Sequence, residues 1–406
     1  MELADIPAIL ILAGIIAYAV LAGADFGAPI WAVTARGKES ARLEQAGHRS
    51  MAPVWEANHV WLIFVLVICW TAYPEIFGSI FSTLWIPLIL ACIGIIMRAV
   101  GYVAGGVSVS RGIIWLAAGA SLLVPFALGT VIGALVAGNV PPGNAAGNVI
   151  TSWLAPVPIT VGVLFIATSA YLAAVYLAAD ARRRREDELA EAFGQRALGA
   201  GILTGLLALA GLVVLYFDAK PFFDAMVSTN GKDNEVGRIC VLVSAIAGTG
   251  TLLLISTRRY GGARFVAAVA VAAIVVGWGL AQQPEILPGL TIHQAAASDE
   301  VIIGLLIAVV IGLLVLIPSL YLLYGLVLGG RFDPLAVPEA GPGEAGRDLE
   351  PANRLRMALV VAVALAGGLM LFTSDSGATL YLGLALFMGG LVGGVLLLAG
   401  SLVRTD

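Results

Sequence analysis

Long apolar runs, separated by short polar or Gly- and Pro-containing connections, recur along the whole chain. Runs of about 20 residues are long enough to cross the ~30 Å hydrocarbon core of a bilayer as helices. Backbone exposed to lipid must satisfy its own hydrogen bonds, and the ten-residue alternation of barrel strands is not visible. The pattern therefore predicts an all-α polytopic membrane protein with about 11 transmembrane helices. The predicted spans are residues 7–32, 54–73, 77–101, 112–137, 154–179, 197–216, 236–256, 263–281, 300–328, 356–372 and 378–402.

Composition supports the membrane class. Hydrophobic residues make up 60% of the 406 residues and charged residues only 12%, whereas a soluble domain carries about 25%. The first apolar run has no basic segment before it and no small-residue cleavage site after it, so we expect a retained helix. A formal charge of −4 gives no indication of a nucleic-acid partner. The three cysteines lie in apolar segments without metal-type spacing and are interpreted as core residues, so no metal site is predicted.

The basic residues predict the orientation. All of the 22 lysines and arginines except Lys220, Lys232 and Arg238 fall on one side of the eleven-span arrangement. Positive charge is retained on the cytoplasmic side. We therefore expect a multi-pass protein of the bacterial inner membrane with its amino terminus outside and its carboxyl terminus in the cytoplasm.

Several polar side chains lie inside the predicted spans, where ionisable groups are costly and usually functional. In the predicted orientation they all fall at the cytoplasmic edge of the first three helices, which indicates one polar cluster at one depth. The cluster comprises Asp25, Glu56, Asn58, His59 and Arg98.

Spacing adds chemistry to this cluster. Glu56 and His59 are three residues apart and share a helix face, as do Trp55 and His59 at four. Arg98 can neutralise either Asp25 or Glu56, and the other carboxylate would then exchange protons more readily. Helix-end residues that only extend toward the headgroups are the alternative interpretation.

The histidines limit what the chain can bind. His48 falls in a predicted cytoplasmic loop and His293 in an external loop, so only His59 lies within a span. A pair of histidine ligands for haem is therefore not available inside the membrane, and no CxxCH attachment site occurs. Any haem is expected mainly in another chain, with His59 as a single ligand left as an alternative.

Four sequence segments resemble cytochrome bd oxidase subunit II. Gly23 to Gly27 (Gly-Ala-Asp-Phe-Gly) is similar to the segment that ends the first helix of that family. Residues 52–63 (Ala-Pro-Val-Trp-Glu-Ala-Asn-His-Val-Trp-Leu-Ile) resemble its most specific motif. Residues 71–74 and Arg98 with Gly101 resemble its Phe-Ala-x-Pro and Arg-x-x-Gly elements. The resemblance extends over about residues 5–330.

The resemblance implies a fold of two four-helix bundles plus peripheral helices. It implies a subunit of a terminal oxidase, an oxidoreductase of the respiratory chain, that supports a haem-bearing subunit I in quinol oxidation coupled to oxygen reduction. Haem b and haem d would be bound mainly by that partner, and a small accessory subunit, quinone and membrane lipid are further expected partners. Glu56, Asp25 and Arg98 match the family's cytoplasmic proton path, while Trp61, with Trp55 beside it, is expected at the oxygen route or in packing.

The sequence departs from the family in two places. Val103 and Ala104 follow Tyr102 where an acidic residue is usual, so His59 is a candidate for the proton route. Two further spans follow a Pro- and Gly-rich linker. We therefore predict a nine-helix domain over 1–330, a cytoplasmic linker over 331–355 and a two-helix extension over 356–406.

Two other functions stay open at this point. A secondary transporter would place polar groups near the middle of the bilayer rather than at one edge. The membrane anchor of another quinone-linked reductase would share the composition but not the oxygen chemistry.

Overall fold

The computed structural model describes residues 2–35, 38–51, 55–105, 111–227 and 235–328, with a few isolated positions beyond. The chain divides into two units, Met1–Pro334 and Leu335–Asp406. Nearly all of the second unit, including the predicted linker and the last two predicted spans, lies outside the described residues. The described helices and strands belong to the first unit. The boundaries of the three segments predicted from the sequence (1–330, 331–355 and 356–406) stay predictions.

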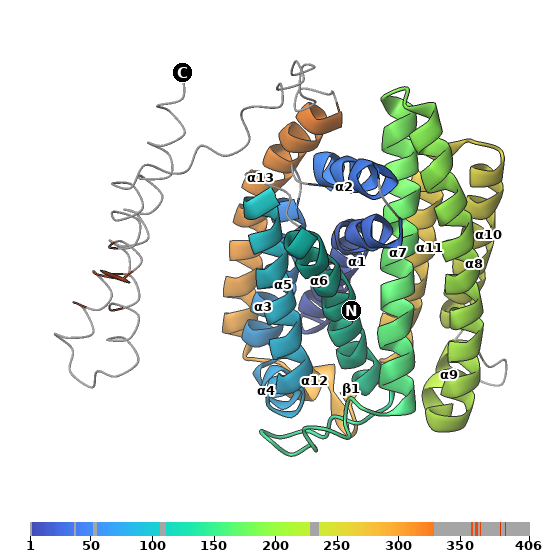
Figure 1. Cartoon of the computed structure of the whole chain (residues 1–406). Coiled ribbons are helices and arrows are strands. Elements are labelled where there is room, and N and C mark those ends of the chain that lie inside the picture. Colours follow the sequence, from blue (N-terminus) through green and yellow to red (C-terminus); the bar gives the residue numbers. More distant parts are fainter. Residues whose placement is uncertain are drawn as a thin grey trace. The chain divides into compact units, whose positions relative to one another are not determined.

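Up to Val136 the described residues of this unit are almost entirely helical (Figure 1). Long apolar helices alternate with shorter ones at the ends of the bundle. The helices are α1 (Asp5–Thr34), α2 (Lys38–Met51), α3 (Trp55–Ala72), α4 (Pro74–Thr83), α5 (Trp85–Gly105) and α6 (Arg111–Val136).

The second half continues the pattern and adds one small hairpin. Its helices are α7 (Pro156–Arg183), α8 (Asp187–Asp218), α9 (Lys220–Val227), α10 (Glu235–Ser256), α11 (Tyr260–Ala281), α12 (Ile292–Ala295) and α13 (Asp299–Leu328). The strands β1 (Glu285–Leu287) and β2 (Leu290–Thr291) pair antiparallel before α12. The predicted all-α class is confirmed.

The long helices form two groups. In the first, α1 packs against α3 and α6, and α5 packs against α6; in the second, α7, α8, α10 and α11 pack together. The groups meet where α1 and α6 pack along α7. At Gly27 a Cβ atom would lie only 1.9 Å from the Ser169 carbonyl oxygen, so any larger residue would force α1 and α7 apart. This close crossing places the end of α1 inside the protein.

The predicted spans correspond well to the long helices, with one error. Seven described helices are long and apolar enough to cross a membrane, or eight if the pair α3 and α4, bent by 119°, is counted as one span. The predicted continuous span 77–101 is wrong, because α4 ends at Thr83 and α5 starts at Trp85. Pro87 explains the break, since it has no N–H for the Thr83 carbonyl and its ring clashes there. The total of eleven spans stays a prediction.

The helix α2 was not predicted. It lies in the connection between the first two spans, and Leu43, Ala46 and Met51 on one of its faces are buried. Gly47 on the same face lies against the end of α1, near Ala28. A short amphipathic helix of this kind gives no span signal, because half of its residues are polar.

The helices α2 and α12 lie at opposite ends of the bundle (Figure 1), and ion pairs are found at both ends. At one end α2 and the turn between α7 and α8 are joined by Arg49 and Glu186, 2.7 Å apart. Arg258, in the turn between α10 and α11, lies 2.8 Å from Glu191 of α8. These are the connections in which the sequence concentrates positive charge.

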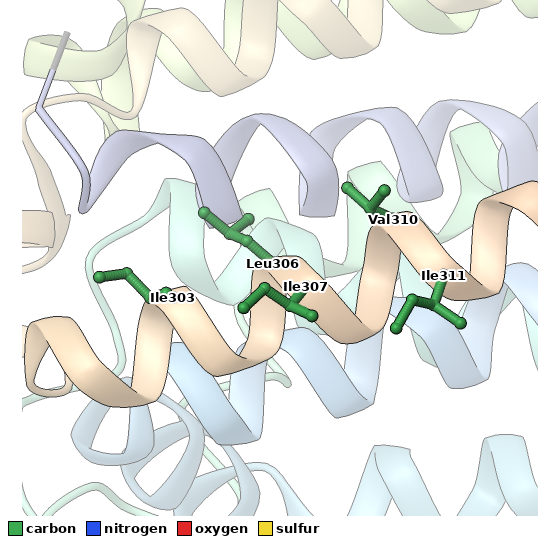
Figure 2. Close-up of a pocket in the computed structure, with 5 residues that line it drawn as sticks. All are labelled: Ile303, Leu306, Ile307, Val310 and Ile311. Carbon is green, nitrogen blue, oxygen red and sulfur yellow. The ribbon is translucent and has the colours of Figure 1, made fainter.

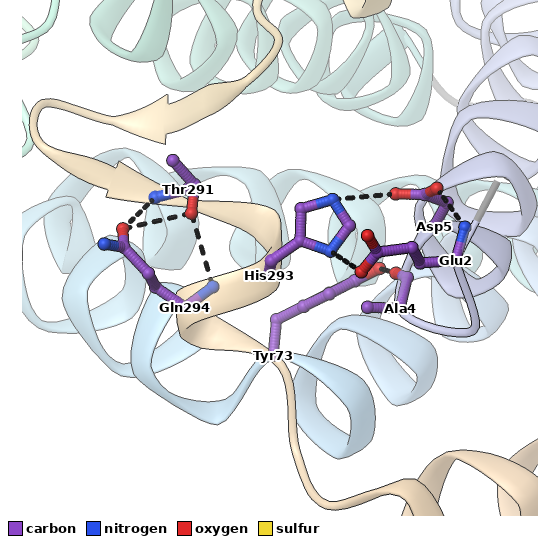
Figure 3. Close-up of polar contacts among 7 residues, drawn as sticks. All are labelled: Glu2, Ala4, Asp5, Tyr73, Thr291, His293 and Gln294. Atoms are coloured by element: carbon purple, nitrogen blue, oxygen red, sulfur yellow. Dashed lines mark hydrogen bonds and ion pairs between the residues drawn. The ribbon is translucent and has the colours of Figure 1, made fainter.

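The other end holds the start of α1 against α12 (Figure 3). His293 Nδ1 lies 3.2 Å from a Glu2 carboxylate oxygen, and its Nε2 lies 3.4 Å from an Asp5 carboxylate oxygen. The Tyr73 hydroxyl donates to the Ala4 carbonyl. The amino-terminal end of α1 is therefore fixed to the end of the bundle that carries α4 and the hairpin.

Candidate functional site: a buried polar cluster at one end of the bundle

The centre of the site is an ion pair between α1 and α5. Arg98 Nη2 donates to Asp25 Oδ1 at 2.9 Å, and the two side chains are 7% and 0% exposed. The same nitrogen donates to the Asp25 backbone carbonyl at 2.8 Å. A buried pair of this kind costs desolvation energy and persists only with good geometry and further hydrogen bonds. The structure thus pairs Arg98 with Asp25, which is one of the two partners that the sequence left open.

A proline makes this geometry available. Pro29 lies inside α1, four residues after Asp25. Proline has no backbone N–H, so the Asp25 carbonyl receives no i→i−4 hydrogen bond from within its helix. That carbonyl is the one to which Arg98 donates. Sequence reasoning missed this, although a proline four residues after a membrane aspartate was a visible signal.

Asn58 joins α3 to the same part of α1. It is 2% exposed, and its Nδ2 donates to the Leu21 carbonyl at 3.4 Å. Arg98 and Asn58 therefore both contact α1, Arg98 at Asp25 and Asn58 one turn earlier at Leu21.

His59 lies one residue further along α3, in an aromatic setting. Its ring packs edge-on against Tyr18, Phe26 and Trp55, with ring centroids 6.0, 5.6 and 5.8 Å away. Its Nδ1 is 2.8 Å from the Trp55 carbonyl oxygen. A carbonyl only accepts hydrogen bonds, so Nδ1 carries a proton and donates it there.

This arrangement does not fit a haem ligand. The remaining nitrogen, His59 Nε2, is buried among these rings, so a planar macrocycle has no approach to it. Within the described ranges, no group of three His, Cys, Asp or Glu side chains could hold a metal ion.

The other predicted site residues are placed as follows. The backbone of Glu56 belongs to the first turn of α3, but its side chain lies outside the described residues. Trp55 packs on His59, so it belongs to the cluster. Trp61 instead packs edge-on against Phe64, further along α3.

His48 was assigned to a loop, but it lies on α2 near the buried pair. Desolvation, and then the positive charge of Arg98, lower the pKa of His48. His48 is therefore a further titratable group at this end of the protein, within the electrostatic range of Arg98. Only the folding of α2 onto α1 brings it there, so the sequence gave no signal for it.

A second acid–arginine pair lies in the second group of helices. Arg264 of α11 donates to Asp180 Oδ1 of α7 at 2.7 Å, and these side chains are 24% and 11% exposed. The Arg264 guanidinium lies 5.1 Å from the centre of the Tyr176 ring. This pair was not predicted, since both residues were assigned to positions at or beyond span ends.

Apolar side chains cover much of the outer surface of the long helices. On α13, Ile303, Leu306, Ile307, Val310 and Ile311 line a shallow apolar depression (Figure 2). Ile307 and Ile311 are more than half exposed. Such a surface suits lipid or another membrane helix rather than water.

Apolar helices of membrane length, polar ends and a buried acid–arginine pair together define a multi-helix integral membrane protein. Residues 3–327 match the family described as cytochrome bd terminal oxidase subunit II. The chain belongs to this family, which confirms the resemblance seen in the motifs. Membership also places it in the bacterial inner membrane.

Two known proteins show how close the relation is. Over 214 residues the chain is 22% identical to a protein named putative cytochrome bd menaquinol oxidase subunit II from Bacillus subtilis (strain 168). That match covers 52% of this chain and 62% of the relative, which is less than two thirds of its length. The fold is similar to a chain of the bd oxidase from Geobacillus thermodenitrificans, with a TM-score of 0.64 and 24% identity. The similarity covers 81% of this chain and 99% of that one.

Proposed function

We propose that this chain is the second subunit of a cytochrome bd-type terminal oxidase. It supports a haem-bearing subunit I that oxidises quinol and reduces oxygen to water. The observation that carries the proposal is the family match over residues 3–327, which spans nearly all of the described helices. Haem groups in the complex, including haem b and haem d, would supply electron transfer and oxygen binding.

The role of this chain is then packing and proton supply rather than haem ligation. Its only histidine in a long apolar helix, among the described residues, is His59, and its Nε2 is enclosed. The apolar strip on α13 and the outer faces of the other long helices suit lipid and a helical partner. Trp61 remains a candidate for the oxygen route, and a small accessory subunit remains a further expected partner.

The polar cluster is proposed to lie on a proton path from the cytoplasm. Reduction of oxygen to water consumes protons, so the complex needs a route for them into the membrane. Arg98 and Asp25 compensate each other's charge inside the protein. Glu56 is then the carboxyl group that takes up and releases protons, with Asn58 and His59 beside it on α3.

The proposed orientation in the membrane follows from the arginines at the end of the protein near the polar cluster. The connections that contain Arg49, Arg182 and Arg258 lie at the end where α2 covers the cluster. Positive charge in such connections favours the cytoplasm. The cluster then opens toward the side from which protons come.

The test is a mild-detergent purification from the native membrane, followed by identification of partners and a reduced-minus-oxidised optical spectrum. We expect a co-purifying subunit with b- and d-type haem bands. A chain that purifies alone and colourless, although a subunit I is expressed, would favour a secondary transporter. Bands of b-type haem without haem d would favour the anchor of another quinone-linked reductase.

A further inference from the structure

Two buried polar atoms belong to rings that are in contact between α1 and α3. The Tyr18 hydroxyl and His59 Nε2 are both shielded from solvent, and neither has a hydrogen-bond partner among the residues that the structure describes. Their rings are in edge contact, with centroids 6.0 Å apart and planes at 80°. A buried polar atom that is left without a hydrogen-bond partner destabilises the folded protein.

The two atoms have complementary hydrogen-bonding character. His59 Nδ1 lies 2.8 Å from the Trp55 carbonyl, which fixes the proton of the neutral imidazole on Nδ1. Nε2 is therefore an acceptor. The Tyr18 hydroxyl can both donate and accept. A molecule that accepts from Tyr18 and donates to His59 would satisfy both atoms at once.

We propose that Tyr18 and His59 hold one internal water molecule between α1 and α3. Buried waters typically make 2–4 hydrogen bonds to polar groups that are otherwise unsatisfied, and apolar cavities stay dry. Here the rings of Phe26 and Trp55 supply an apolar wall around His59, and the two polar atoms supply the bonds. Water is the ligand of the right size and of both donor and acceptor character.

The position of this site extends the polar cluster inward. Tyr18 precedes Asp25 by seven residues, which is two helical turns and about 10 Å along α1. Ala22, between them on the same face, is fully buried. The water lies on the inner side of the cluster, away from the end that carries α2.

The role of the water rests on the proposed proton path. A proton that reaches it can pass to His59 Nε2, and the resulting imidazolium can return that proton to the same water. It cannot pass through the ring, because Nδ1 faces a backbone carbonyl that does not take protons. His59 is thus a positioning and proton-holding group at the side of the path, not a link in a through-going chain.

The experiment is a high-resolution cryo-EM map of the intact complex, for the wild type and for Tyr18→Phe. We expect a density peak within about 2.6–3.2 Å of both the Tyr18 hydroxyl and His59 Nε2. This peak should vanish in Tyr18→Phe while the His59 ring stays in place. A dry contact between the two side chains, or occupation of the position by the Glu56 carboxylate or by a partner side chain, overturns the proposal.

Turnover measurements distinguish a role of Tyr18 and its water in proton delivery from a role in packing alone. Tyr18→Phe should lower quinol oxidation about threefold to tenfold, the rate equivalent of one lost hydrogen bond. It should also raise the solvent isotope effect, because proton delivery becomes slower. Tyr171→Phe, which removes a buried hydroxyl from α7, is the matched control and should change neither quantity. An unchanged isotope effect in Tyr18→Phe overturns the proton role, and normal haem bands in the same samples show that the oxidase assignment is unaffected.

Discussion

Each of the two groups of helices contains an aspartate–arginine pair with mostly buried side chains, and these two pairs differ in burial. Asp25 and Arg98 are 0% and 7% exposed, whereas Asp180 and Arg264 are 11% and 24% exposed. Both arginines also donate to a backbone carbonyl, but at 2.8 Å in the first pair and 3.4 Å in the second. Similar residues thus form a fully enclosed pair in one group and a partly solvated pair in the other.

Helix chemistry explains the difference in the carbonyl bonds. The Asp25 carbonyl has no partner within α1, because residue 29 is a proline. The Tyr176 carbonyl is followed four residues later by Asp180, which has a backbone N–H and lies inside α7. Arg98 therefore takes an unused acceptor, while Arg264 shares one. The first pair is thus fully buried and has an additional hydrogen bond to a free backbone carbonyl. The second pair is partly exposed and shares a carbonyl that the helix already uses.

The largest expected effect is on assembly. Arg98→Met removes the charge that compensates buried Asp25 and should destabilise the protein by about 3–5 kcal/mol. The same change at Arg264 should cost less, about 1–3 kcal/mol, because that pair is partly exposed to solvent. Thermal unfolding of the purified complex and the yield of assembled protein measure both.

The double variant Asp25→Leu with Arg98→Met sharpens this result. Removing both charges should recover much of the lost stability, since no buried charge then lacks a partner. Equal losses of stability in Arg98→Met and Arg264→Met would contradict the expectation that the more deeply buried pair matters more.

The second effect is on turnover. Glu56→Gln keeps the size of the side chain but removes its acid function, and should lower quinol oxidation by about 100-fold, the lower end of general acid–base contributions. Asp180→Asn in the second group is the matched control, and turnover should stay near the wild-type value. Stopped-flow or oxygen-electrode rates, with haem spectra to count intact complexes, give the measurement. Normal turnover in Glu56→Gln with intact spectra would remove Glu56 from the proton path.

A smaller effect is expected at the proline. Pro29→Ala restores an N–H that competes with Arg98 for the Asp25 carbonyl, so about 1 kcal/mol of coupling should link positions 29 and 98. A double-mutant cycle with Arg98→Met, read from unfolding free energies, measures it. A coupling near zero would show that the freed carbonyl adds nothing to the buried pair.

The smallest expected effect is the contribution of His48 to the pH dependence of stability. Burial and Arg98 lower the pKa of His48, so the folded protein resists protonation of this residue. Between that lowered pKa and the ordinary value of about 6.5, the unfolded chain binds more protons, and stability falls as pH falls. Comparing the thermal stability of the wild type with that of His48→Gln at pH 7.5 and 5.5 should show a shallower loss in the variant. An equal loss of thermal stability in the wild type and in His48→Gln would show that His48 does not interact electrostatically with Arg98.

The sequence indicated candidate residues for the site but not their arrangement. The depth of Asp25, Asn58, His59 and Arg98 followed from the span pattern, because polar residues at helix ends are visible in an apolar sequence. The pairing of Arg98 with Asp25 did not follow, since it depends on how α1 and α5 are rotated about their axes. Tyr18 was not predicted either, because a tyrosine in an apolar helix is not a recognisable signal in the sequence.

The sequence by itself determined the membrane class, the positions of the long helices and the family. These depend on hydrophobic length and on local motifs, which are properties of consecutive residues. Only the tertiary structure decided the break before α5, the docking of α2 over the cluster and the different burial of the two acid–arginine pairs. These depend on which helix faces meet, and the free energy of a buried charge is set by neighbours that are distant in the sequence.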